Sequence, residues 1–229
     1  MSAVHFPLPI KAVMIDLDGT LLDTIPDLAA AANMMLEELN RPPLAVELIR
    51  TFVGKGLPRL VERTLAAGRN GDADPELNER ALAIYERIYA EVNGRHTTIY
   101  PGVREALESL TAQGFPLACV TNKTGCFTTP LLESIGFAGY FKHVVSGDTL
   151  ARRKPDPAPL LHVCQALNIA PRDMLMIGDS YNDTEAARAA GCPVFCVTYG
   201  YNEGRDVREL NADALIDSLL EAVRLIQKA

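Results

Sequence analysis

The residues best suited to chemistry are two aspartates near the N-terminus, Asp16 and Asp18. They lie in the sequence DLDGT at residues 16–20, directly after the apolar run at residues 12–15. With each residue type used at roughly 5–7%, a DxDGT match arises by chance in fewer than about 1% of chains of this length. A calcium-binding loop is a poor alternative, because Gly19 has the wrong offset and no glutamate closes the loop. Carboxylates at a strand end can bind a cation or take part in nucleophilic and acid–base chemistry.

Three further polar clusters follow apolar runs along the chain. They are Thr121, Asn122 and Lys123, then Lys154, and then Asp179 with Asp183. Each has an ordinary explanation on its own, because threonine and asparagine form turns and an aspartate can cap a helix. In a parallel α/β sheet, however, ligands bind beyond the carboxyl ends of the strands. The joint order of the clusters predicts that four strand ends converge on one crevice.

Carboxylates gathered in one crevice repel one another. Two unit charges about 4 Å apart cost roughly 4 kcal/mol at an effective dielectric constant near 20. Asp16, Asp18 and Asp179 therefore need compensation, and a bound phosphate dianion would increase that need. A divalent cation together with Lys154 supplies it, and ligands that are all oxygen favour Mg²⁺. We expect a Mg²⁺ site that handles a phosphorylated substrate.

Other hydrolase chemistries do not match the sequence. No cysteine is followed six residues later by arginine, so a cysteinyl-phosphate loop is absent. Residues 178–182 lack the second glycine of a nucleophile elbow, and residues 54–56 complete neither a P-loop nor a GxGxxG motif. The five cysteines form no CxxC pair, which indicates reduced thiols, and Cys119 and Cys196 lie in apolar runs typical of a core.

The elements that must position these side chains alternate between strand and helix. Because such alternation is typical of a parallel sheet with both faces covered, we predict an α/β fold with a Rossmann-like parallel sheet core. The expected strands are residues 12–15, 117–120, 144–145, 174–177 and 194–197, and the expected helices are 103–113, 127–135, 157–167 and 183–190.

Residues 27–91 break this alternation, because they hold helical patterns and no convincing strand. The helical segments are residues 27–39, 46–52, 57–67 and 75–90. We interpret them as a small helical cap inserted after the first strand, with hinges at residues 24–26 and 93–95. The expected division is therefore residues 1–22 and 96–229 for the α/β hydrolase core, and residues 23–95 for the cap.

Composition limits the partners. The 229 residues carry a net charge of −7, which argues against non-specific binding to nucleic acid or to an anionic membrane. No apolar run approaches the ~20 residues of a membrane span, and residues 1–10 lack the pattern of a secretory signal. We expect a cytoplasmic monomer or homodimer that acts on a small phosphorylated metabolite, with no nucleic acid and no membrane as partner.

With these motifs, the chain resembles the haloacid dehalogenase-like hydrolase superfamily, in particular its phosphoglycolate phosphatase branch. The superfamily motifs match residues 16–20, residues 121–122, Lys154, and residues 178–179 with Asp183. The helical insertion matches the small cap of that branch, and the resemblance runs from about residue 12 to residue 216. Thr124 is a small departure, because proline is expected there in this branch.

The resemblance implies a mechanism. Asp16 would attack phosphorus and form an aspartyl-phosphate, while Asp18 would protonate the leaving alkoxide and then accept a proton from water. Mg²⁺ would be held by Asp16, the backbone carbonyl of Asp18 and Asp179, with Asp183 close by or acting through water. Thr121, Asn122 and Lys154 would hold the phosphoryl oxygens, and we expect Gly19 and Thr20 to contact the substrate as well.

The resemblance also implies 2-phosphoglycolate as the substrate. Lys55 and Arg59 flank a glycine turn that opens a cap helix, where free N–H groups favour anions. A closing cap would bring Lys55 or Arg59 to the carboxylate of the substrate. Another phosphatase or a phosphomutase of the same superfamily, acting on a different small phosphorylated metabolite, remains an alternative.

Two more distant alternatives fit the motifs less well. Dehalogenases and phosphonoacetaldehyde hydrolases of the superfamily replace the second aspartate of the first motif, so Asp18 argues against both. A non-enzymatic phosphate-sensing module would need neither an acid at Asp18 nor a cap.

Overall fold

The centre of the molecule is a six-stranded parallel sheet. The computed structural model describes residues 5–67 and 74–229. Its strands are ordered β6-β5-β2-β7-β8-β9, and every neighbouring pair is parallel. They are β2 (Ala12–Ile15), β5 (Leu117–Val120), β6 (Phe141–Val145), β7 (Met174–Gly178), β8 (Val194–Val197) and β9 (Ala214–Ile216). The predicted Rossmann-like α/β core is confirmed, with β9 as an edge strand that the sequence pattern did not indicate.

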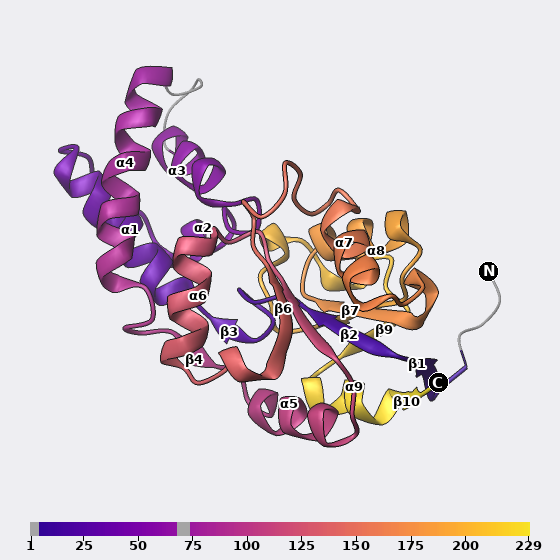
Figure 1. The fold of residues 1–229 in the computed structure, drawn as a ribbon. Helices are drawn as coiled ribbons and strands as arrows, with labels where there is room; N and C mark the ends of the chain where they lie inside the picture. Colours follow the sequence, from indigo (N-terminus) through magenta and orange to yellow (C-terminus); the bar gives the residue numbers. More distant parts are fainter. Residues whose placement is uncertain (1–4, 68–73) are drawn as a thin grey trace.

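Helices cover both faces of this sheet (Figure 1). On one face lie α5 (Val103–Ala112) and α9 (Leu219–Leu225), and on the other α7 (Ala158–Leu167) and α8 (Tyr181–Ala190). Because successive side chains of a strand point to opposite faces, Val13 of β2 packs in one core and Met14 in the other. Strands buried on both faces must be apolar throughout, which explains why continuous apolar runs predicted them.

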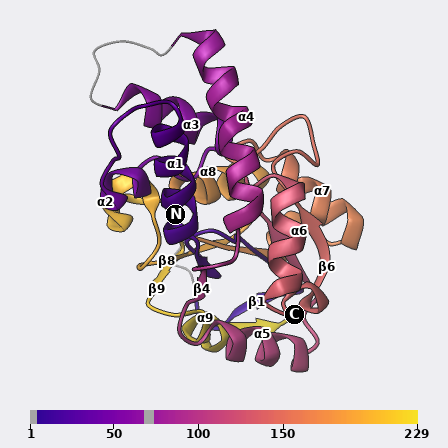
Figure 2. The same cartoon turned by 90° about the vertical axis from the view of Figure 1, so that its left-hand side faces the viewer.

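A second, helical part lies at one end of the sheet (Figures 1 and 2). It contains α1 (Ile25–Glu38), α2 (Val46–Arg50), α3 (Leu57–Ala66) and α4 (Pro75–Val92), as the sequence predicted. These helices have their own apolar core, which includes Met35, Leu60 and Tyr85. Helix α6 (Gly125–Ser134) bridges the two parts, since its Phe127 packs with the helical core and its Leu131 with the sheet core. We propose that the cap spans residues 23–95 and the hydrolase core residues 1–22 and 96–229.

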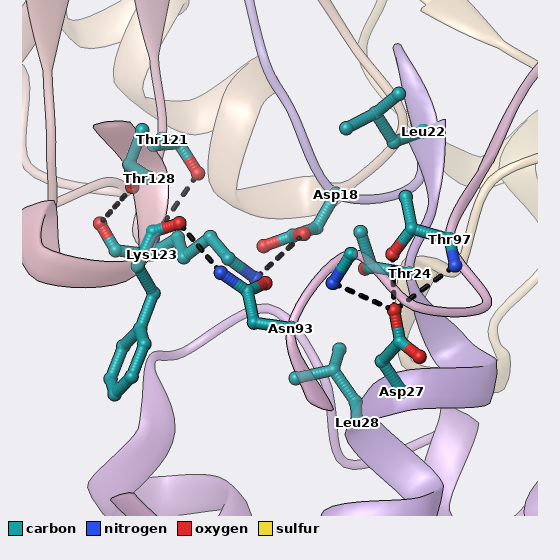
Figure 3. A network of polar contacts seen from close by, with 12 residues as sticks. Asp18, Leu22, Thr24, Asp27, Leu28, Asn93, Thr97, Thr121, Lys123 and Thr128 are labelled. Atoms are coloured by element: carbon teal, nitrogen blue, oxygen red, sulfur yellow. Dashed lines mark hydrogen bonds and ion pairs between the residues drawn. The ribbon is translucent and has the colours of Figure 1, made fainter. Parts of the chain in front are cut away.

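The two connections of the cap leave the core side by side. Strands β3 (Leu22–Asp23) and β4 (Thr98–Ile99) pair antiparallel at this point. The buried Asp27 in α1 accepts hydrogen bonds from the backbone N–H groups of Gly94 and His96. It also accepts from the backbone N–H and the hydroxyl of Thr97 (Figure 3). One carboxylate therefore fastens the start of the cap to the chain that returns from it.

Two short strands form a separate small sheet. Strands β1 (Leu8–Ile10) and β10 (Ile226–Lys228) form a parallel pair. All five cysteines are free, and Cys119 and Cys196 are buried in β5 and β8 as predicted. Among the described residues, no helix combines the length and the apolar character that a membrane crossing needs.

Candidate active site

One cavity lies at the carboxyl edge of the sheet, and the helical part forms its roof. The polar clusters predicted at the ends of β2, β5 and β7, together with Lys154, line it: Asp16, Asp18, Thr121, Asn122, Lys154 and Asp179. The roof is made by Leu28 of α1, Val53 and Gly54 of the loop after α2, and Leu57 and Leu60 of α3. The expected convergence of the strand ends is therefore present in the fold, whereas the chemical role of each residue stays a prediction.

Lys154 lies at the floor of the cavity, with its side chain only 1% exposed. Its Nζ is 2.9 Å from Asp16 Oδ1 and 2.7 Å from Asp183 Oδ1, and it donates a hydrogen bond to the Val120 carbonyl. Burial lowers the pKa of Lys154, but the two carboxylates outweigh burial and raise it above the ordinary value. The ammonium therefore stays charged, with hydrogen bonds to Asp183 and the Val120 carbonyl and an ion pair with Asp16.

The carboxylates around Lys154 are more numerous than one ammonium can neutralise. Asp16, Asp179 and Asp183 each offer an oxygen, and these atoms lie within 4.8 Å of one another. Burial raises the pKa of Asp16 to about 7 against the effect of Lys154, with a further contribution from Asp183. Burial, Asp183 and Asp16 raise the pKa of Asp179 well above its ordinary value. A cluster of crowded, buried oxygen donors fits a hard metal cation, which would restore the ionised state of these groups.

The oxygens of Asp183 are already engaged. Oδ1 accepts from Lys154, while Oδ2 accepts from the backbone N–H groups of Asp179 and Ser180 and from the Ser180 hydroxyl. With Ser180 as the N-cap of α8, this is a capping box that fixes the start of the helix. These contacts favour an indirect role, in which Asp183 orients Lys154 and the loop that carries Asp179.

Asp179 contacts residues 19–20, which follow β2, and the loop after β8. Its Oδ2 accepts the backbone N–H of Tyr201 at 2.6 Å, and its Oδ1 lies 3.5 Å from the Thr20 hydroxyl. A Cβ atom on Gly19, whose φ is +88°, would lie 2.3 Å from Asp179 Oδ2, so only glycine fits there. Gly19 and Thr20, which we expected to contact the substrate, therefore pack against Asp179 and are not among the residues that line the cavity.

The segment after β5 ties the core to the cap. Asn122 Nδ2 donates hydrogen bonds of 2.8 Å to the carbonyls of Gly54 and Lys154. The Thr121 hydroxyl accepts the backbone N–H of Lys123 at 3.1 Å. Lys123 Nζ in turn lies 3.2 Å from Asp18 Oδ1 (Figure 3). The sequence pattern placed Lys123 in the cluster that follows this strand, but it assigned a catalytic or binding role to Thr121 and Asn122 only.

The structure does not bring the two predicted cap cations to the cavity. Lys55 Nζ lies 3.1 Å from Glu203, with its side chain 34% exposed. Arg59 pairs with Glu62 on the same helix, with its side chain 51% exposed. Both lie beside a separate surface depression, and the glycine turn between them reaches the cavity through Gly56. A contact of Lys55 or Arg59 with a substrate carboxylate stays a prediction.

Comparisons with known proteins agree with this geometry. A family model described as haloacid dehalogenase-like hydrolase matches residues 10–191. A phosphoglycolate phosphatase of Nitrosospira multiformis is 59% identical over 226 residues, covering 99% of this chain and 100% of that protein. One of Thiobacillus denitrificans is 54% identical, covering 98% and 99%. The crystal structure of a predicted phosphoglycolate phosphatase from Haemophilus somnus has a TM-score of 0.91 at 32% identity, covering 95% of this chain and 98% of that one.

Proposed function

The chain belongs to the haloacid dehalogenase-like hydrolase family, and we propose that it hydrolyses 2-phosphoglycolate to glycolate and phosphate. The observation that carries this proposal is the set of groups in one roofed cavity: Asp16 beside Lys154 and Asp179, with Asp18 two residues away. The names of relatives that match nearly the whole chain support phosphoglycolate as the substrate.

Asp16 would act as the nucleophile. Its carboxylate attacks phosphorus, the bond between phosphorus and the ester oxygen breaks, and an aspartyl-phosphate forms. Lys154, which contacts Asp16, would neutralise the phosphoryl oxygens together with the polar groups of Thr121 and Asn122. Mg²⁺ would be held by Asp16, Asp179 and the backbone carbonyl of Asp18, with Asp183 behind them, and would supply positive charge to the phosphoryl group.

Asp18 would act as acid and then as base. It gives its proton to the ester oxygen, which leaves as the hydroxyl group of glycolate. It then takes a proton from water as that water attacks the aspartyl-phosphate, which releases phosphate and regenerates Asp16. Both steps require Asp18 to reach the oxygen opposite Asp16, and both residues line the same cavity.

The cap must open to admit the substrate. The cavity has a volume of about 40 Å³, which is room for a few water molecules at ~10–15 Å³ each and not for a phosphate ester. The Gly54 carbonyl accepts hydrogen bonds from Asn122 and Asn182, so this loop of the cap is fastened to the core in the closed state. A closed cap excludes bulk water and strengthens the charged contacts inside.

The test of the proposed function is phosphate release from a panel of esters. With Mg²⁺ present, we expect the highest kcat/KM for 2-phosphoglycolate, with lower values for ethyl phosphate and for larger sugar phosphates. A preference for another ester would identify a different phosphatase of the family. Transfer of phosphate between positions of one sugar, without release to water, would identify a phosphomutase. We further propose that the protein is cytoplasmic and acts as a monomer or homodimer.

Removal of the metal should abolish turnover, because the buried carboxylates are left without a compensating cation. We expect chelation to stop phosphate release and Mg²⁺ to restore it. Asp179→Asn should raise the Mg²⁺ concentration that gives half-maximal activity by about tenfold or more. Mg²⁺ should also raise the Tm of the wild type and raise that of Asp179→Asn less, because a ligand stabilises only the fold that binds it.

The matched control is Asp156→Asn, which alters a carboxylate that pairs with Arg152 outside the cavity. This variant should keep the wild-type response to Mg²⁺. Full activity of the wild type after thorough chelation, or an unchanged Mg²⁺ response in Asp179→Asn, would contradict the assignment of the metal site.

A further inference from the structure

We propose that Lys123 binds the carboxylate of the substrate and so determines the preference for phosphoglycolate. This inference rests on the proposed function and assigns recognition of the substrate carboxylate to one residue. Lys123 directly follows the Thr121-Asn122 pair after β5, and its side chain is 1% exposed. A buried ammonium is costly unless anionic or polar groups surround it, so its position inside the cavity needs a reason.

The cavity has two cations among the described residues that line it, Lys154 and Lys123. Lys154 Nζ donates hydrogen bonds to Asp183 Oδ1 and the Val120 carbonyl, and it forms an ion pair with Asp16. A substrate with a phosphate and a carboxylate presents two separate anionic groups. Because Lys154 lies beside the nucleophile Asp16, it is placed for the phosphate, which leaves Lys123 as the cation within the cavity for the carboxylate.

The distance between Lys123 and Asp18 matches the substrate. In phosphoglycolate one carbon atom separates the ester oxygen from the carboxylate. The residue that protonates this oxygen and the residue that binds the carboxylate must therefore be close neighbours. Lys123 Nζ lies 3.2 Å from Asp18 Oδ1, the contact drawn in Figure 3. Lys55 and Arg59 pair with Glu203 and Glu62 instead.

The contacts of the ammonium leave room for a further anion. Lys123 Nζ donates to Asp18 Oδ1 and to the Tyr89 hydroxyl, so two of its three N–H donors have these partners. A substrate carboxylate can take the third donor, or replace Asp18 as that side chain turns towards the ester oxygen. Such charge-assisted bonds are strong where water is excluded.

Tyr89 links this contact to the cap. It belongs to α4, is fully buried, and its ring lies under the Lys123 ammonium at 4.7 Å from Nζ to the ring centre. The core thus supplies the cation, and the cap supplies the group that orients it. A carboxylate bound by Lys123 would therefore lie where the core and the cap meet.

The test compares two substrates that differ in the carboxylate, 2-phosphoglycolate and ethyl phosphate. Lys123→Met keeps an unbranched apolar side chain and removes the charge. We expect it to lower the ratio of kcat/KM for phosphoglycolate to kcat/KM for ethyl phosphate by about 10- to 100-fold, the range for loss of one hydrogen bond to a charged group. Tyr89→Phe keeps the ring and the ammonium, so we expect a smaller loss of the same selectivity.

The comparison variant is Lys55→Met, which removes the charge of the cap lysine next to the glycine turn and tests whether that lysine binds the carboxylate instead. A loss selective for phosphoglycolate in Lys55→Met, with none in Lys123→Met, would overturn the proposal and assign the carboxylate to the cap. Equal losses on both substrates in Lys123→Met and Tyr89→Phe would also overturn it, because they would show a purely structural role.

Inhibitors separate this proposal from the proposed function. 3-Phosphonopropionate keeps the carboxylate of the substrate, whereas propylphosphonate lacks it, and neither can be hydrolysed. We expect wild-type protein to bind the first at least about tenfold more tightly in competition with ethyl phosphate, and Lys123→Met to lose that ratio. If phosphoglycolate is a poor substrate, the proposed function fails, but this ratio still supports or refutes binding of a carboxylate by Lys123.

Discussion

Asp16→Asn should lower kcat by at least about a thousandfold while the protein keeps its fold. An amide cannot attack phosphorus as the carboxylate does, and loss of a covalent nucleophile is among the largest single effects in an enzyme. The measurement is single-turnover and steady-state release of phosphate from 2-phosphoglycolate with Mg²⁺. Trapping of an acid-stable phosphorylated protein in the wild type, absent in Asp16→Asn, would identify the covalent step.

The stability of this variant gives a second readout. Because burial raises the pKa of Asp16 from 3.8 to about 7, its ionisation opposes folding of the metal-free protein as the pH rises through this interval. At pH 8 the metal-free Asp16→Asn protein should therefore have a Tm equal to or above that of the wild type, whereas below pH 4 the difference should vanish.

Retention of more than about a hundredth of the wild-type rate in Asp16→Asn would refute Asp16 as the nucleophile.

Asp18→Asn should lower kcat for alkyl phosphates by about 10²- to 10⁴-fold, the usual contribution of a general acid or base. The loss arises because asparagine cannot protonate a poor leaving group. With p-nitrophenyl phosphate, whose leaving group needs no proton, the first turnover should be nearly as fast as in the wild type. The later turnovers should be slow, because activation of water also needs Asp18, and the phosphorylated protein should accumulate.

Rapid-mixing measurement of p-nitrophenolate release distinguishes these phases. The matched control is again Asp156→Asn, whose carboxylate lies outside the cavity. If first-turnover rates fall equally for ethyl phosphate and p-nitrophenyl phosphate, Asp18 does not act as a general acid. Its effect would then come from the ion pair with Lys123.

The architecture of the core could be predicted because it depends on local pattern. Strands buried on both faces must be continuous apolar runs, and residues 12–15, 117–120 and 174–177 are such runs and form β2, β5 and β7. Strand β9 escaped prediction because Ala214 is half-buried and Leu215 is 38% exposed at the edge of the sheet, which leaves a short and mixed pattern.

The core of the candidate site could be predicted for a related reason. Asp16 and Asp179 directly follow strands, and parallel strands place their carboxyl ends at one edge of the sheet. The backbone sets the position of such a residue, and a short motif largely determines the backbone conformation there. Lys154 reaches the cavity for the same reason, because it lies on the loop between β6 and α7.

By itself, then, the sequence determined the type of fold, the inserted helices and the acidic residues at the strand ends, because these follow from periodicity and from neighbours along the chain. Only the tertiary structure decided which partners the polar side chains contact. Lys55 pairs with Glu203, and the Thr20 hydroxyl lies beside Asp179. Lys123 lies in the cavity between Asp18 and Tyr89. Each of these partners lies far away in sequence, and a flexible side chain goes to whichever charge or cavity packing brings within its reach.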